Sequence, residues 1–203
     1  METPTPTIGV LALQGAFVEH EQALARLGVP TRQVRLPEHL AGLDGLIIPG
    51  GESTVIGKLM VKYELDDAMR RFAAEGGAIW GTCAGMILLA REVGREQPLL
   101  GLLDIDVERN AYGSQLFSFE EDVVLPGLGI PNLRAVFIRA PVVSRVSSGV
   151  TVEATDSHGN VIAVSHGNIL ATAFHPELTD DTRLHEHFCA MAARSAFQPM
   201  ASM

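Results

Sequence analysis

Short apolar segments alternate with amphipathic helical patterns throughout the first half of the sequence, and this alternation limits the possible folds most strongly. The apolar segments predict buried strands at residues 7–13, 31–36, 46–48 and 78–80. Apolar residues spaced three and four apart predict helices at residues 18–27, 65–74 and 84–92. Strands that alternate with helices form βαβ units. We therefore expect an α/β fold, with an open and mostly parallel sheet that carries helices on both faces.

The second half of the sequence is richer in strands. Strands are predicted at residues 107–125, 133–143, 151–154, 161–164 and 169–174, and a last helix, capped by Asp180, at 183–193. The tetrapeptide Ser-His-Gly-Asn occurs at 157–160 and again at 165–168, between strands in both cases, which is typical of hairpin turns. No linker-like stretch separates the halves. The sequence thus indicates one domain over residues 1–203, with short polar tails at 1–6 and about 197–203, whose sheet is extended by antiparallel strands.

Composition and charge exclude several classes of protein. With 203 residues, 47% of them hydrophobic and 19% charged, the chain is too apolar to be disordered. Its apolar runs, of about five residues, are too short to cross a bilayer. The net charge of −9 repels phosphate backbones and anionic membranes, so we expect neither nucleic acid nor a membrane as a partner. The two cysteines, with no secretory signal before them, indicate reduced thiols and a cytoplasmic location.

The segment Gly81-Thr82-Cys83-Ala84-Gly85 lies between a predicted strand and a predicted helix. Its pattern, G-x-C-x-G, is the cysteine counterpart of a nucleophile elbow, in which a sharp strand-to-helix turn exposes the reactive atom. The helix dipole favours a thiolate at Cys83, and the N–H of Ala84 faces the same side as an oxyanion donor. The alternative is a structural cysteine in a glycine-rich turn. Cys189, in the middle of the last helix among apolar neighbours, is expected in the core.

A cysteine nucleophile needs a base, and the base needs a third group that orients it. Among seven histidines, His175 ends an apolar strand and is followed by Pro176 and Glu177, so that an imidazole and a carboxylate project to the same side. The alternative is a simple His-Pro turn. Five of the other histidines have plainer interpretations. His20 lies on a solvated helix face beside Glu19 and Glu21, and His158 and His166 belong to hairpin turns. His185 and His187 form a weak metal motif with Cys189.

A Cys elbow followed 92 residues later by His-Pro-Glu resembles the class I glutamine amidotransferases. Further segments are similar to one family among them, the glutaminase subunits of pyridoxal 5′-phosphate synthase. These segments occur in order from about residue 7 to 190: Gly9-Val10-Leu11-Ala12-Leu13-Gln14-Gly15, Pro49-Gly50-Gly51-Glu52-Ser53-Thr54, Glu108-Arg109-Asn110, Phe137-Ile138-Arg139-Ala140-Pro141 and Ala173-Phe174-His175-Pro176-Glu177-Leu178-Thr179. The joint occurrence is far more specific than G-x-C-x-G alone.

The resemblance implies a role for particular residues. Cys83 would be the nucleophile, with His175 and Glu177 as its relay. The N–H groups of Gly51 and Ala84 would form the oxyanion hole. The glutamine pocket would be lined by Gly51, Glu52, Ser53, Arg109, Ile138 and Arg139. The sequence departs from the family at Ser114, where an arginine is usual before Gln115, and this puts in doubt any role of that position.

The same resemblance implies a function. The chain would hydrolyse L-glutamine to L-glutamate and ammonia through a cysteine thioester, a reaction that needs no metal, nucleotide or flavin. It would deliver the ammonia to a synthase subunit within a hetero-oligomer. Two alternatives stay open at this point: the glutaminase subunit of another amidotransferase, in histidine or purine synthesis, and a non-catalytic α/β binding protein.

Overall fold

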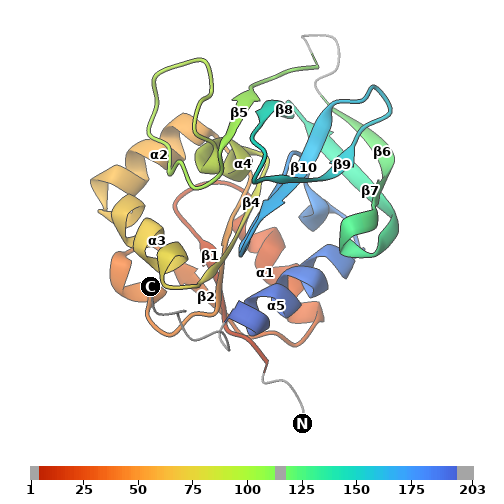
Figure 1. Cartoon of the computed structure of the whole chain (residues 1–203). Helices are drawn as coiled ribbons and strands as arrows, with labels where there is room; N and C mark the ends of the chain where they lie inside the picture. Colours follow the sequence, from red (N-terminus) through yellow and green to blue (C-terminus); the bar gives the residue numbers. More distant parts are fainter. Residues whose placement is uncertain (1–4, 113–117, 196–203) are drawn as a thin grey trace.

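A nine-stranded mixed sheet forms the centre of the protein, with helices on both of its faces (Figure 1). The computed structural model describes residues 5–112 and 118–195. The expected polar tails lie almost wholly outside these residues. The strands of the sheet, in chain order, are β1 (Ile8–Leu11), β2 (Thr31–Val34), β3 (Gly45–Ile48), β4 (Ala78–Thr82), β5 (Ile105–Glu108), β8 (Val142–Val146), β9 (Thr151–Thr155), β10 (Val161–His166) and β11 (Ile169–Thr172).

The spatial order of the strands is β2-β1-β3-β4-β11-β10-β8-β5, with β9 paired to β10. The first five of these strands are parallel to their neighbours, and β10, β8, β5 and β9 add antiparallel pairs. The four strands β1, β3, β4 and β11 are buried along their whole length, as parallel strands covered on both faces must be. The expected parallel sheet with an antiparallel extension is confirmed.

The helices form two layers (Figure 1). Helices α1 (Phe17–Arg26) and α5 (Arg183–Ser195) cover one face, and α2 (Ser53–Lys62), α3 (Leu65–Ala74) and α4 (Ala84–Leu89) cover the other. Trp80 of β4 is fully buried beneath the first layer, where its ring contacts that of Phe188 on α5. Within the described residues, no helix combines the length and the apolar character that a membrane span requires.

A separate two-stranded sheet, β6 (Ser118–Leu125) and β7 (Ile130–Ile138), forms an antiparallel hairpin beside β9. Short 3₁₀ turns complete the chain: η1 (Pro37–Leu40), η2 (Pro126–Leu128) and η3 (Pro176–Leu178). The backbone N–H of His175, just before η3, donates to the carbonyl of Val136 on β7 at 2.8 Å. The hairpin therefore lies against the chain that carries the predicted relay.

The structure adds one helix and corrects three expectations. Helix α2 was not predicted, because Pro49-Gly50-Gly51 indicates a break and Gly57 lies inside the helix. The expected strand 107–125 is two strands, interrupted at Asn110 by a left-handed residue with φ +52°. The expected strand 133–143 also divides, since β7 ends at Ile138 and β8 begins at Val142. At the start of α5, the carboxylate of Asp181 rather than Asp180 accepts the backbone N–H of Arg183, at 3.0 Å.

Candidate active site

Cys83 lies in a strained turn between β4 and α4, with φ +48° and ψ −100°. Such a conformation is costly for a residue with a side chain and is typical of nucleophile elbows. Its N–H donates to the carbonyl of Thr172 on β11 at 2.8 Å, and its Sγ lies 3.9 Å from the carbonyl of Ile138. Gly85 packs so closely on the Ile48 carbonyl that a Cβ atom would overlap it. The predicted strand–turn–helix context of Cys83 is confirmed.

His175 and Glu177 lie together at the end of β11, which is the neighbour of β4 in the sheet. The Nδ1 atom of His175 is 2.7 Å from Oε1 of Glu177, and both residues are buried. The imidazole rests on the backbone of Gly50, where any side chain would overlap the ring. Because β4 and β11 are parallel and adjacent, their carboxyl ends bring the cysteine and the histidine to the same edge of the sheet.

The surroundings shift the pKa values of this pair in opposite directions. Burial alone would lower the pKa of His175, but hydrogen bonds and charge attraction from Cys83 and Glu177 outweigh it and raise the pKa to about 10. Burial alone would raise the pKa of Glu177, but the nearby His20 and His175 hold it below its usual value. An imidazolium beside a carboxylate is therefore the stable state of this pair at neutral pH.

Two loops bring backbone groups to the same edge. Gly50, after β3, accepts a hydrogen bond from the N–H of Ala16 at 3.0 Å. Gly15, with φ +104°, lies so close to this carbonyl that no side chain fits. The Oε1 atom of Gln14 accepts the N–H of Glu52 at 2.8 Å. The Gly50-Gly51 segment is thus held against the loop that follows β1.

A polar cluster lies beside this loop at the start of α2. Glu52 caps the helix by accepting the N–H groups of Thr54 and Val55, and it pairs with Arg109 at 3.1 Å. Burial opposes ionisation of Glu52, but these helix N–H groups and Arg109 together lower its pKa. Gln97 joins the cluster through contacts of 3.3 Å to Arg109 and 3.4 Å to Ser53. The structure therefore brings Glu52, Ser53 and Arg109 together.

The remaining predicted pocket residues come from the end of β7. The Ile138 carbonyl faces Cys83, and Arg139 follows in a left-handed conformation with φ +46° and an exposed side chain. In the described part of the chain, no hydrogen bond or ion pair joins the Arg139 side chain to the cluster around Glu52. Ser114 and Gln115, where the sequence departs from the family, lie outside the described residues.

The structure contradicts the interpretation of His20. We expected this residue on a solvated face, yet it is fully buried, with ring nitrogens 3.0 Å from Nε2 of His185 and 3.2 Å from Oγ1 of Thr82. A usable signal was present, because His20, Ala23, Leu24 and Leu27 follow a helical apolar spacing that the neighbouring glutamates obscured.

The other residues that sequence reasoning missed are Gln14, Gln97 and Thr82. Gln14 ends an apolar strand, and Thr82 precedes the elbow cysteine, so their positions offered a signal that was not used. Gln97 offered none. Cys189 is buried as expected, and burial raises the pKa of its thiol to about 11. Among the described residues, no group of three His, Cys, Asp or Glu side chains is placed to hold a metal ion, and this includes the surroundings of His185 and Cys189.

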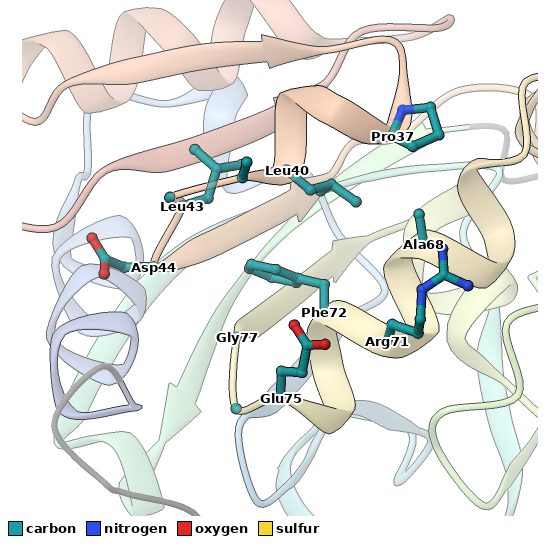
Figure 2. A pocket seen from close by; sticks show the side chains of 12 residues that line it. Pro37, Leu40, Leu43, Asp44, Ala68, Arg71, Phe72, Glu75 and Gly77 are labelled. Atoms are coloured by element: carbon teal, nitrogen blue, oxygen red, sulfur yellow. The ribbon is translucent and has the colours of Figure 1, made fainter.

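A cavity of about 410 Å³ lies at the opposite edge of the sheet, before β3 and β4. Figure 2 shows the Phe72 ring reaching from α3 toward Leu40 and Leu43, with Arg71 and Glu75 nearby. Ligands of open α/β sheets gather at the carboxyl ends of the strands, whereas this cavity lies at the amino ends. It contains none of the predicted site residues.

Fold and site together define a class I glutamine amidotransferase-like α/β protein. A solved structure described as a glutamine amidotransferase superposes with a TM-score of 0.87 at 52% sequence identity, covering 91% of this chain and 98% of that one. The structure of PurLQS from Thermotoga maritima matches in fold alone, with a TM-score of 0.66 at 17% identity over 92% of this chain and 99% of that one.

Residues 10–194 match the SNO glutamine amidotransferase family, and the chain belongs to that family. A protein of Herpetosiphon aurantiacus named pyridoxal 5′-phosphate synthase subunit PdxT is 56% identical over 189 residues, which cover 91% of this chain and all of the relative. The PdxT of Deinococcus radiodurans is 54% identical, over 94% of this chain and all of the relative.

Proposed function

We propose that this chain is the glutaminase subunit of a pyridoxal 5′-phosphate synthase, which hydrolyses L-glutamine to L-glutamate and ammonia. One observation supports this most: Cys83, in its strained elbow, stands on the strand adjacent to the one that ends in the His175–Glu177 pair, whose atoms are 2.7 Å apart. A nucleophile, a base and an orienting carboxylate on neighbouring strand ends are what thioester chemistry requires.

In the first half of the reaction, the Cys83 thiolate attacks the side-chain amide carbon of glutamine. A C–S bond forms, and the carbonyl electron pair moves to oxygen. The N–H groups of Gly51 and Ala84 stabilise this oxyanion. When the C–N bond breaks, the His175 imidazolium gives its proton to the departing nitrogen, which leaves as ammonia. A thioester and a neutral imidazole remain.

In the second half, a water molecule attacks the thioester and passes a proton to His175, which restores the imidazolium. The C–S bond then breaks, so that glutamate and the Cys83 thiolate are released. Glu177 accepts the Nδ1–H of His175 throughout, which fixes the tautomer and stabilises the imidazolium. The raised pKa of His175 fits this role, because the ring must hold a proton before ammonia leaves.

Glutamine itself carries a carboxylate and an ammonium, so that its pocket needs both donors and acceptors. The Glu52–Arg109 pair offers one of each beside the Gly51 loop. Ser53, Ile138 and Arg139 complete the proposed pocket, with the Ile138 carbonyl on the nucleophile side. The pairing of Glu52 with Arg109 holds both side chains in place before glutamine arrives.

Ammonia is useful only when it reaches its acceptor before it is lost to solvent. The subunit therefore acts as one glutamine amidotransferase domain docked on a synthase subunit. Its reduced nucleophilic thiol fits the cytoplasm, and thioester chemistry needs no cofactor. The relatives named PdxT support this assignment over a subunit of histidine or purine synthesis. The intact set of Cys83, His175 and Glu177 speaks against a non-catalytic binding protein.

Replacement of the nucleophile tests the proposal. Cys83→Ala removes the only sulfur at the site, so ammonia release from glutamine should fall to background with and without the synthase subunit. The complex should still make pyridoxal 5′-phosphate from added ammonium salt, which shows that the synthase subunit is active and that only the ammonia supply is lost. Cys189→Ala, at the other cysteine, serves as the control and should keep its glutaminase rate. Glutamine hydrolysis that persists in Cys83→Ala would contradict the proposal.

A further inference from the structure

Two buried histidines from opposite ends of the chain stand behind the proposed relay. His20 on α1 and His185 on α5 are both fully buried, with His20 Nδ1 3.0 Å from His185 Nε2. The rings are held by Trp80, which makes edge contacts to both, with centroids 5.7 Å and 5.0 Å away. Burial of two polar imidazoles in an apolar layer costs free energy unless their nitrogens are hydrogen-bonded, so the position of this pair needs a physical reason.

The explanation lies in the second oxygen of Glu177. Oε1 is bonded to His175, whereas Oε2 is fully buried and has no hydrogen-bond partner among the described residues. Nε2 of His20 lies 3.4 Å from this oxygen. An unpaired buried carboxylate oxygen is costly. At this distance His20 and Glu177 are in ion-pair range but not joined by a hydrogen bond, and a small movement of either side chain would let the ring donate to Oε2.

The surroundings also assign the tautomers. A neutral imidazole carries one N–H and one bare nitrogen. With the proton on Nε2, His20 turns its N–H toward Oγ1 of Thr82, at 3.2 Å, and Oε2 of Glu177, at 3.4 Å, and presents a bare Nδ1 to the Nε2–H of His185. This leaves Nδ1 of His185, which has no partner, as the bare nitrogen. The opposite assignment would turn a lone pair toward the carboxylate and bury an N–H of His185 without an acceptor.

We propose that His20, fixed in its Nε2–H tautomer by His185, is a positioning residue that holds the second oxygen of Glu177 and thereby aligns the His175 relay. The inference rests on the proposed function. His20 touches neither glutamine nor the reacting atoms, and acts through Glu177 alone. Its Nε2 is also 3.2 Å from Oγ1 of Thr82, next to Cys83, so the same ring ties the strand of the nucleophile to the carboxylate.

The protonation states agree with this arrangement. Burial lowers the pKa of His20, although Glu177 acts in the opposite direction, and burial and His20 together lower that of His185 to about 3. Both shifts favour the neutral form of the ring. The other charged or titratable groups that act on the pair are Glu19, Arg26 and His175.

Substitution at position 20 separates donation from space filling. His20→Leu keeps much of the volume but has no donor, whereas the amide of His20→Gln can still donate to Oε2. In the complex with the synthase subunit, His20→Leu should lower kcat for glutamine hydrolysis about 10–100-fold, by analogy with the hydrogen-bond partners that orient metal-ligating histidines, with KM nearly unchanged. His20→Gln should recover most of this loss. His158→Leu, at an exposed hairpin turn, is the matched control and should keep the wild-type kcat.

The pH profile provides a second readout. In His20→Leu, the ring that helps to keep Glu177 ionised despite its burial is lost, so the pKa of Glu177 should rise. The acidic limb of the kcat–pH profile should then move to higher pH. In His20→Gln the limb should stay in place. A purely structural role would lower the rate of both variants alike and leave the limb in place. Equal loss in Leu and Gln variants, or a wild-type kcat in His20→Leu, would overturn the proposal.

Imidazole ¹⁵N NMR of the wild-type chain keeps the test independent of activity and of variant folding. His20 and His185 should both be neutral, with protons on Nε2, between pH 6 and pH 8. A proton on Nδ1 of His20 would overturn the proposal. A wild-type complex that releases no ammonia would instead refute the proposed glutaminase function, while the NMR result would still decide the arrangement at Glu177.

Discussion

A single carboxylate lies between two imidazoles of opposite character. His175, on one side of Glu177, has a raised pKa, whereas His20, on the other side, has a lowered one. Both rings are buried, so burial does not explain the difference. At His175, hydrogen bonds and charge attraction from Cys83 and Glu177 outweigh burial, whereas at His20 the attraction of Glu177 alone does not. The residue type alone does not determine the role, because the neighbours decide the charge.

Glu177→Gln tests how far the carboxylate controls its neighbour. The substitution removes an anion that stabilises the imidazolium, so the pKa of His175 should fall below the wild-type value of about 10. Because less of the ring then carries the proton that ammonia needs, kcat should fall as well. We expect a smaller loss than the about 10²–10⁴-fold that removal of the base in His175→Asn should cause. An NMR titration of His175 measures the pKa, and an unchanged titration in Glu177→Gln would contradict this account.

The residue scale also shows what the sequence could and could not predict. Cys83, His175 and Glu177 were predicted as a set, because an elbow pattern and a His-Pro-Glu strand end carry their chemistry in short segments. His20 was misassigned, because its contacts come from residues 62 and 165 positions away, Thr82 and His185. Short-range patterns report the face of a helix, but they do not report which polar groups that face meets.

At the scale of elements, the elbow depends on close backbone packing between β3 and α4. Gly85 is the second residue of α4, and its Cα lies against the carbonyl of Ile48, the last residue of β3. Any side chain there must push the helix away from the strand. Since α4 begins directly after Cys83, such a shift would also move the nucleophile.

Gly85→Ala should therefore destabilise the protein by about 1–3 kcal/mol, as overpacking does, and should lower glutaminase activity. Gly149→Ala is the matched control, because its nearest neighbour, a ring atom of His166, lies at an ordinary 3.6 Å. Its free energy of unfolding should change by less than about 0.5 kcal/mol. Urea unfolding of both variants measures the difference, and a Gly85→Ala variant as stable as Gly149→Ala would rule out the packing argument.

Elements with a regular spacing of apolar residues were predicted well, whereas elements whose residues favour other structures were not. Helix α3 was predicted with its observed bounds, because its apolar spacing ends at glycines. Helix α2 was missed, because Glu52 directly before it is not one of the usual N-cap residues, although its side chain accepts two helix N–H groups. Its β-branched residues and Gly57 favour other structures, and tertiary packing outweighs them: Gly57 lies against the carbonyl of Pro98.

At the scale of the whole molecule, the candidate site is assembled from loops that are distant in the sequence. The loops after β1, β3, β4 and β11 meet at one edge, and the end of β7 lies over them. Parallel strand order explains why these loops converge, but the sequence alone does not give that order. The site was predicted as a whole only through the family resemblance, whose motifs fall on these same loops.

The Gly50-Gly51 peptide lies at the centre of this assembly and is the proposed second oxyanion donor. Its carbonyl is held by the N–H of Ala16, and the planar peptide points its N–H in the opposite direction. Two adjacent glycines allow the unit to rotate at little steric cost. A docked synthase subunit that binds only one orientation would therefore fix the direction of the Gly51 N–H.

We therefore expect docking to raise the kcat of glutamine hydrolysis at least several-fold. Loss of one oxyanion donor lowers kcat by about 10²–10³-fold. A partner that turns the Gly51 N–H toward the oxyanion could therefore restore much of this rate. The measurement is steady-state glutamate production by the chain alone and with a saturating amount of synthase subunit. Cys83→Ala with the same amount of partner gives the background rate. An equal kcat with and without the partner would leave the Cys83 chemistry intact, but it would show that docking does not complete the oxyanion hole.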